Sequence, residues 1–157
     1  MALMKALMSG LAGATAVTLV HETARRNVNS APRADILGVR AVENVLMAAN
    51  QQPPTGDQLH QIALAADVVS NTAYYSLVGA GRPRGGLLRG LVLGLLAGIG
   101  GITLPGPLGL GEAATDRRPE TQVMTVAWYL LGGLVAGLVY QLLTGRRAEP
   151  ATVEMMA

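Results

Sequence analysis

The chain has 157 residues, of which 50% are hydrophobic and only 14% are charged, and its formal net charge is +2. Soluble domains carry roughly 25% charged residues, so this composition, with 20 glycines and no phenylalanine, indicates a membrane protein. The absence of cysteine excludes disulfide frameworks, zinc–thiolate sites and cysteine nucleophiles. The small net charge argues against nucleic acid as a partner. A chain of this length is expected to form one membrane domain, residues 1–157.

Four apolar stretches have about the length that a membrane-spanning helix needs, which is ~20 residues. The expected spans are residues 4–21, 58–79, 86–104 and 122–144. The second is the most polar, because it contains Asp67 and Asn71. The first resembles a signal peptide in its small residues, but its apolar residues continue to Val20, so a retained helix is expected. The predicted fold class is an all-α polytopic membrane protein with a four-helix bundle.

The long connection between the first two spans contains a fifth predicted helix. Apolar residues repeat with helical spacing over residues 33–49, with polar residues between them. Such an amphipathic helix is expected to lie in the membrane interface. The prolines at 53–54 end it, and residues 55–58, Thr-Gly-Asp-Gln, match a capping box that would start the second span.

Small residues form a stripe on the third predicted span, where glycines recur every four positions at Gly86, Gly90, Gly94 and Gly98. A stripe of this kind lets two helices approach closely in lipid. The fourth span offers Gly133 and Gly137 in return. Packing of these two helices within one chain is the simpler interpretation. The alternative is a contact between copies in an oligomer, or with another membrane subunit.

Polar residues of the second predicted span share one narrow helix face: His60, Asp67, Asn71 and Tyr74. Asp67 lies roughly 10 Å inward from His60 along the helix, and a carboxylate at that depth must be paired, hydrated or turned into the bundle. The first span, antiparallel to the second, offers a facing set of Thr15, Thr18, Glu22, Arg25 and Arg26. An arginine of this set, Arg25 or Arg26, would neutralise Asp67 if it reaches inward. These residues form either a network that fixes helix register or a site that handles protons or ions.

Other candidate sites are less specific. His21 and His60 are expected at the same side of the membrane, which raises a metal or haem hypothesis, but two interfacial histidines are too few for the usual ligand sets. No cofactor and no catalytic residue are therefore expected. Basic residues on the opposite side are candidates for binding lipid phosphates: Arg82, Arg84, Arg89, Arg146 and Arg147.

Four segments carry a resemblance: HETARR at 21–26, APRADILG at 31–38, SNTAYYSLVG at 70–79 and ETQVMTVAWY at 120–129. They are similar to segments of small bacterial inner-membrane proteins that have no assigned function. The resemblance implies four spans and no particular activity. Each side of a four-span chain would carry six Lys and Arg residues, so the positive-inside rule is tied. Cytoplasmic termini are the expected orientation.

The sequence favours a function without catalysis. The leading hypothesis is an oligomeric or accessory membrane subunit that packs through its glycine-rich helices, with lipids and other membrane chains as partners. The alternative is a channel or transporter for ions, protons or small solutes that uses the polar face of the second span. A third hypothesis is an interfacial enzyme built on Glu22, Arg25, His60 and Asp67.

Overall fold

The computed structural model describes residues 1–81, 83–111, 115 and 118–145, and these residues form an all-helical fold. Two short 3₁₀ turns, η1 (Leu77–Gly79) and η2 (Pro83–Gly85), connect the third and fourth of its α-helices. The α-helices are α1 (Ala2–Asn27), α2 (Ala34–Ala48), α3 (Gly56–Ser76), α4 (Gly86–Thr103) and α5 (Pro119–Gly145).

Three of the described helices are long and apolar enough to cross a membrane, namely α1, α4 and α5. Their most apolar segments have mean hydropathies of 1.5, 1.7 and 1.8. The sequence predicts a fourth span where α3 lies, but α3 does not reach the same hydropathy. Its 21 residues are sufficient in length, so its polar side chains are what separate it from the other three.

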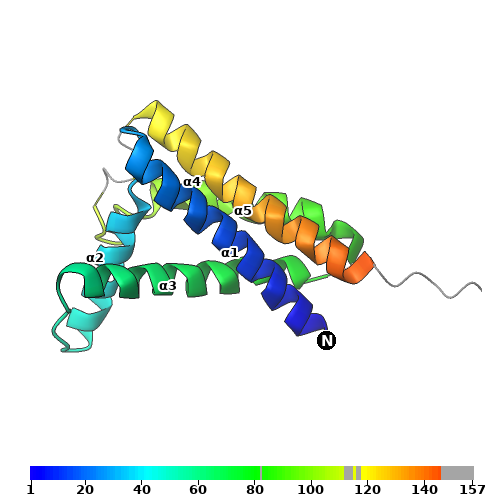
Figure 1. The fold of residues 1–157 in the computed structure, drawn as a ribbon, viewed down its shortest axis with the longest axis horizontal. Coiled ribbons are helices and arrows are strands. Elements are labelled where there is room, and N and C mark those ends of the chain that lie inside the picture. Colours follow the sequence, from blue (N-terminus) through cyan, green and yellow to red (C-terminus); the bar gives the residue numbers. More distant parts are fainter. Residues whose placement is uncertain (82, 112–114, 116–117, 146–157) are drawn as a thin grey trace, which may run out of the picture.

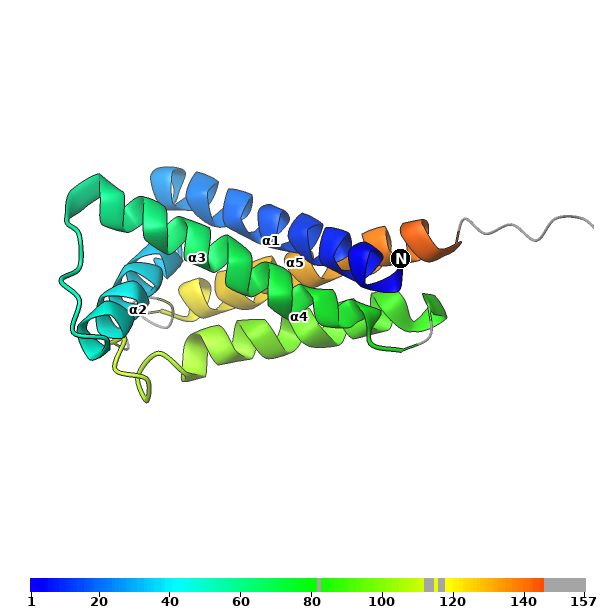
Figure 2. The same ribbon diagram turned by 90° about the horizontal axis from the view of Figure 1, so that it is seen from below.

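The helices are arranged around α1 and α5, which run antiparallel and side by side (Figures 1 and 2). α4 packs along α5, and α3 packs mainly against α1 and α2. Figure 1 shows α3 crossing α1, with α2 at the end where the two helices diverge. Three helices therefore surround the region between the C-terminal end of α1 and the N-terminal half of α3.

The glycine stripe of α4 is covered by α5 of the same chain. All four glycines of the stripe are buried, and a Cβ atom built on Gly94 would lie 2.6 Å from the carbonyl oxygen of Tyr129. A Cβ on Gly98 would lie 2.7 Å from the Cα of Val126. These distances allow no side chain, so glycine is what permits the two backbones to touch. The simpler interpretation of the stripe, packing within one chain, describes this contact.

α1 uses glycine in the same way, which the spacing in the sequence did not indicate. A Cβ on Gly10 would clash with the backbone of α3 at Thr72 and Ser76, and a Cβ on Gly13 would lie 2.6 Å from the carbonyl oxygen of Gly132 on α5. Two glycines three residues apart therefore seat α1 against both neighbours.

The helix ends differ from the predicted ones in two informative places. α1 continues six residues beyond the predicted end at residue 21 and ends at Asn27, because Glu22, Arg25 and Arg26 form ion pairs along the helix. Thr55 is the residue that precedes α3, as the capping box predicts, but its side chain makes no capping hydrogen bond. The predicted capping-box hydrogen bond from Thr55 is therefore wrong.

Candidate functional site

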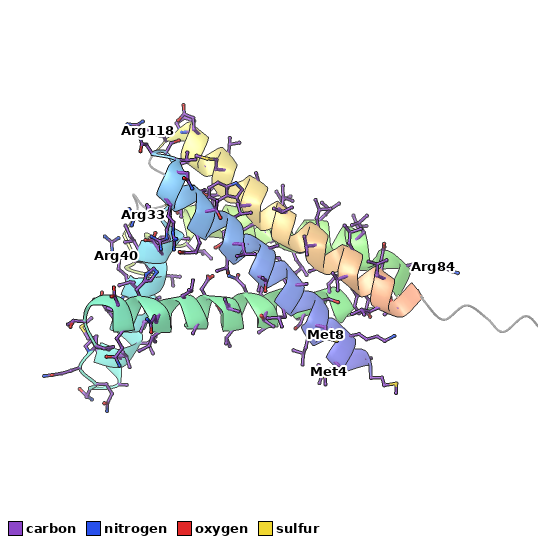
Figure 3. The ribbon with its side chains drawn as sticks, in the orientation of Figure 1. Met4, Met8, Arg33, Arg40, Arg84 and Arg118 are labelled. Atoms are coloured by element: carbon purple, nitrogen blue, oxygen red, sulfur yellow. The ribbon has the colours of Figure 1, made fainter. Side chains whose placement is uncertain are left out.

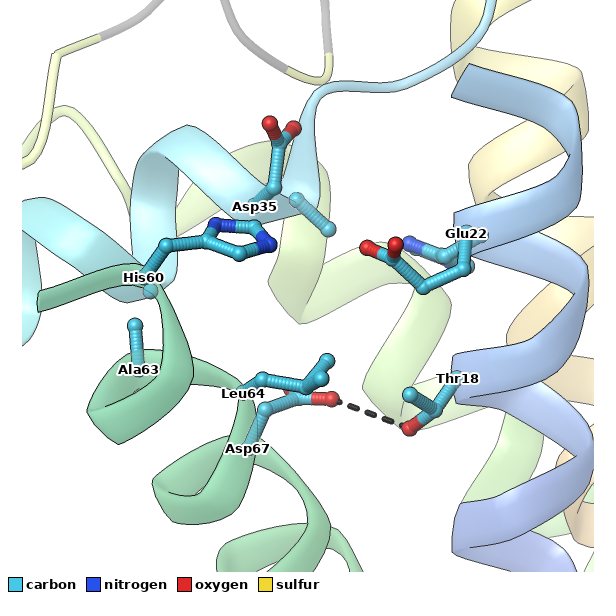
Figure 4. A pocket seen from close by; sticks show the side chains of 10 residues that line it. Thr18, Glu22, Asp35, His60, Ala63, Leu64 and Asp67 are labelled. Atoms are coloured by element: carbon cyan, nitrogen blue, oxygen red, sulfur yellow. Dashed lines mark hydrogen bonds between the residues drawn. The ribbon is translucent and has the colours of Figure 1, made fainter. Parts of the chain in front are cut away.

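A small cavity lies between α1, α2 and α3 (Figure 4). Its volume is about 30 Å³, which is room for a water molecule or two and too little for an organic substrate. Three carboxylates and two histidines contribute to its walls. The lining residues are Thr18, His21 and Glu22 of α1, Ala34, Asp35 and Gly38 of α2, and His60, Ala63, Leu64 and Asp67 of α3.

The half-buried Asp67 carboxylate is held by neutral donors. The hydroxyl of Thr18 donates a hydrogen bond to one carboxylate oxygen over 3.2 Å, and the side-chain amide of Asn71 donates to the other over 2.9 Å. Figure 4 shows the Asp67 side chain directed toward α1 and Thr18. Within the described part of the chain, no arginine, lysine or histidine forms an ion pair with Asp67. Hydrogen bonds therefore fix its position, without an opposite charge from the described residues.

The arginines expected to pair with Asp67 bind Glu22 instead. Arg25 donates two hydrogen bonds to the Glu22 carboxylate, over 2.7 and 2.6 Å, and Arg26 lies 3.5 Å from the same group. Glu22 lies one turn before both arginines on the same helix, where side chains three and four residues apart are neighbours. The Arg25 guanidinium also lies 3.5 Å from Nε2 of His60, which links Glu22 to the α3 face as the sequence predicts.

Asp35, at the start of α2, is a residue of the cavity that sequence reasoning missed. Arg33 binds its carboxylate through two hydrogen bonds of 2.8 and 2.7 Å. Burial alone would raise the pKa of Asp35, but the hydrogen bond and charge of Arg33, with the charge of Arg25, hold the pKa below its ordinary value. Asp35 is therefore a charged wall of the cavity at neutral pH.

His21 forms a buried edge of the cavity. Its ring packs edge-on against Trp128 and Tyr129 of α5, with ring centroids 5.0 and 5.5 Å apart. Its Nε2 atom is buried and has no hydrogen-bond partner among the described residues. A buried polar atom of this kind is ordinarily satisfied by water, so His21 favours a hydrated cavity.

The predicted polar face of α3 divides into two parts. His60, Asp67 and Asn71 gather at the cavity and its edge. Tyr74 instead donates its hydroxyl to the backbone carbonyl of Leu93 on α4, over 2.9 Å. Tyr74 therefore connects two helices and does not contribute to the cavity.

The histidine and arginine predictions have different outcomes. His21 and His60 both line the cavity, but no set of three or more His, Cys, Asp or Glu side chains among the described residues is arranged to hold a metal ion.

Among the arginines predicted to bind lipid phosphates, Arg84 is exposed, whereas Arg89 donates to the carbonyl of Val78 over 2.8 Å and lies over the ring of Tyr140. The candidates Arg82, Arg146 and Arg147 lie outside the described residues.

Comparison with known proteins finds no matching family model, no matching curated protein and no matching solved structure.

Proposed function

We propose that this protein is a small membrane channel or transporter for protons or small cations, and that Asp67 is its binding group. The observation that carries the proposal is the Asp67 carboxylate, which lines a cavity of about 30 Å³ and has hydrogen-bond donors but no basic partner among the described residues. Ionisable groups inside membranes mark proton and ion pathways. The cavity size matches a proton, a water or a small cation.

The proposal includes α3 as a fourth span. Its 21 residues give a length of about 31 Å at 1.5 Å per residue, close to the ~30 Å of a bilayer's hydrocarbon core. Large apolar side chains are exposed along its outer face, at Ile62 and Val69, and at Leu77 directly after its end. Asp67, Asn71 and Tyr74 turn inward toward α1 and α4. These inward side chains thus lower the mean hydropathy of α3 from a face that lipid would not touch.

α2 fits an interfacial position beside this bundle. No residue of α2 is buried, and Val45 and Met47 are exposed apolar residues near its C-terminal end. A helix of this kind lies in the plane of the interface. The resemblance of the sequence to bacterial inner-membrane proteins supports that membrane as the location, and we keep cytoplasmic termini as the proposed orientation.

The other two hypotheses from the sequence receive less support. The accessory-subunit hypothesis used the glycine stripe of α4 as a contact surface, but α5 covers that stripe, so an oligomer would need a different surface. The interfacial-enzyme hypothesis needs a substrate pocket at Glu22, Arg25, His60 and Asp67, and the cavity there holds no more than small molecules of the size of water.

Flux through reconstituted vesicles tests the proposal. The wild-type protein should move protons, sodium or potassium down a gradient, measured with a fluorescent indicator trapped inside the vesicles. Asp67→Asn should abolish most of this flux, because the amide has no charge and no exchangeable acid proton. Asp57→Asn, which changes an exposed carboxylate in the first turn of the same helix, is the matched control and should retain wild-type flux. Equal flux in the two variants, or no flux of any of these ions in the wild type, would refute the proposal.

A further inference from the structure

A second cavity, which shares no lining residue with the first, is lined by arginines. Its volume is about 550 Å³, and its walls come from the end of α1, the α1–α2 connection, α2 and the start of α5. Figure 3 shows Arg33, Arg40 and Arg118 at this end of the molecule, far from Arg84 at the other end. Five arginines line the cavity: Arg25, Arg26, Arg33, Arg40 and Arg118.

Only part of this positive charge is neutralised by described acidic residues. Glu22 takes both hydrogen bonds of Arg25, and Asp35 takes those of Arg33. Arg26 is 69% exposed and lies 3.5 Å from the already occupied Glu22. Arg40 donates to a backbone carbonyl, that of Leu110. Arg118 forms no ion pair with an acidic residue of the described ranges. Among the described residues, the cavity therefore has more guanidinium groups than carboxylates to pair with them.

The position of the cavity suits an anion at a membrane surface. Arg25 and Arg26 lie in the last turn of α1, and Arg118 directly precedes α5. Both helices are long and apolar enough to cross a membrane, so their ends would lie at the depth of lipid headgroups. Guanidinium groups bind phosphate oxygens in pairs of parallel hydrogen bonds.

We propose that the arginine cavity is a binding site for a phosphate group, supplied by an anionic lipid headgroup or by free phosphate. The cavity has room for a headgroup. Arg26 shares the carboxylate of Glu22 with Arg25, and neither Arg40 nor Arg118 forms an ion pair with an acidic residue that the structure describes. The site lies at the opposite end of the molecule from Arg84, an exposed member of the set that the sequence predicts for lipid phosphates (Figure 3).

Native mass spectrometry of the full chain in detergent tests this proposal with two probes, phosphatidic acid and inorganic phosphate. Wild-type protein should retain phosphatidic acid over phosphatidylcholine. The double variant Arg26→Gln/Arg118→Gln should bind it about tenfold or more weakly, the effect of losing a hydrogen bond to a charged group. Arg84→Gln removes one exposed arginine from the other end and should bind like wild type. Arg26→Lys/Arg118→Lys should recover part of the affinity, because lysine keeps the charge but not the paired geometry.

The two probes separate the sources of the phosphate. Competition between inorganic phosphate and phosphatidic acid supports a site that recognises the phosphate group itself. Retention of inorganic phosphate alone also supports the site, with free phosphate as its ligand. Wild-type affinity of the double glutamine variant for both probes would overturn the proposal. An equal loss of affinity in Arg84→Gln would also overturn it, because that result would indicate attraction of the probes to positive charge anywhere on the protein. Both Arg26 and Arg118 are exposed, and unchanged thermal unfolding of the variants checks that they fold.

Discussion

The hydroxyl of Tyr75 on α3 donates a hydrogen bond of 2.8 Å to the backbone carbonyl of Tyr129 on α5. Tyr75 is completely buried, and its hydroxyl also lies against Gly132, where a Cβ atom would be 2.9 Å away. This contact joins α3 to α5, although the two helices share few other contacts. A single phenol therefore connects the helix that carries the candidate site to the centre of the bundle.

Tyr75→Phe should lower the free energy of unfolding by about 1 kcal/mol, the usual value of one buried hydrogen bond. The loss is moderate because the phenyl ring still fills the space. Unfolding in mixed micelles can be followed by the fluorescence of Trp128, the only tryptophan. Tyr140→Phe is the control: its hydroxyl lies 3.4 Å from the carbonyl oxygen of Gly79, so a smaller loss is expected. Equal losses in the two variants would contradict this assignment.

Gly94→Ala should destabilise the fold by about 1–3 kcal/mol, the range for overpacking. The added Cβ would meet backbone atoms of Tyr129 and Leu130 at 2.6 and 2.8 Å, and backbone cannot move aside alone. Gly100→Ala is a control on the same helix, because its nearest neighbour is the end of the Leu104 side chain at 3.3 Å. Thermal unfolding in detergent compares the two. Loss of crosslinked oligomers in Gly94→Ala, with unchanged thermal stability, would instead indicate that the stripe joins copies of the chain.

Ser70→Cys tests the position of α3 directly, because the chain has no cysteine of its own. Ser70 is exposed on the outer face of α3, which faces lipid if α3 is a span. A membrane-impermeant maleimide should then leave Cys at this position unmodified in intact membranes, and react only after denaturation. Gln51→Cys, in the exposed connection before α3, should react from one side of the membrane. Rapid labelling of both variants would put α3 in water.

The Arg33–Asp35 pair predicts a dependence of stability on acid pH. Burial opposes the charge on Asp35, but Arg33 outweighs it, so the pKa of Asp35 is lower in the folded state than its ordinary value near 4. Folding therefore favours the carboxylate, and the contribution is complete above about pH 4. It is lost as the pH falls through the lowered pKa of the folded state.

Comparison of unfolding free energies in wild type and Asp35→Asn measures this contribution. The difference should be constant above about pH 4 and shrink at lower pH. In an Arg33→Gln background the same substitution should have a much smaller effect, because the group that lowers the pKa is gone. A difference that stays constant down to the most acidic pH would show that Asp35 does not titrate in this way.

Local patterns in the sequence explain most of the helices. The glycines at every fourth position of α4 identify its contact face, because that spacing places small residues on one side of any helix. The apolar run predicts an end at residue 104, and α4 ends one residue earlier, at Thr103. Whether α3 crosses a membrane is harder to predict from hydropathy. An average over the helix does not separate the side chains that face other helices from those on its outer face.

The candidate site was predicted where it depends on helical periodicity, and missed where it depends on packing between distant segments. His60, Asp67 and Asn71 share a face through their spacing alone. Arg25 pairs with Glu22 because α1 continues to Asn27, which places the two side chains one helical turn apart. Asp35 joins the site because α2 folds back between α1 and α3, and the arginine cavity gathers residues as far apart as Arg25 and Arg118. Such long-range contacts leave no periodic signal in the sequence.

The glycine contacts of α1 constrain the order in which the protein assembles during synthesis. Through Gly13, α1 packs against α5, which is the last of the described helices to leave the ribosome. The first helix therefore lacks this contact until more than a hundred further residues have been translated. Because distant contacts form slowly, the packing of α1 against α5 is expected to be a late step. A ribosome stalled before α5 would leave Gly13 uncovered, although α3 would already be available to Gly10.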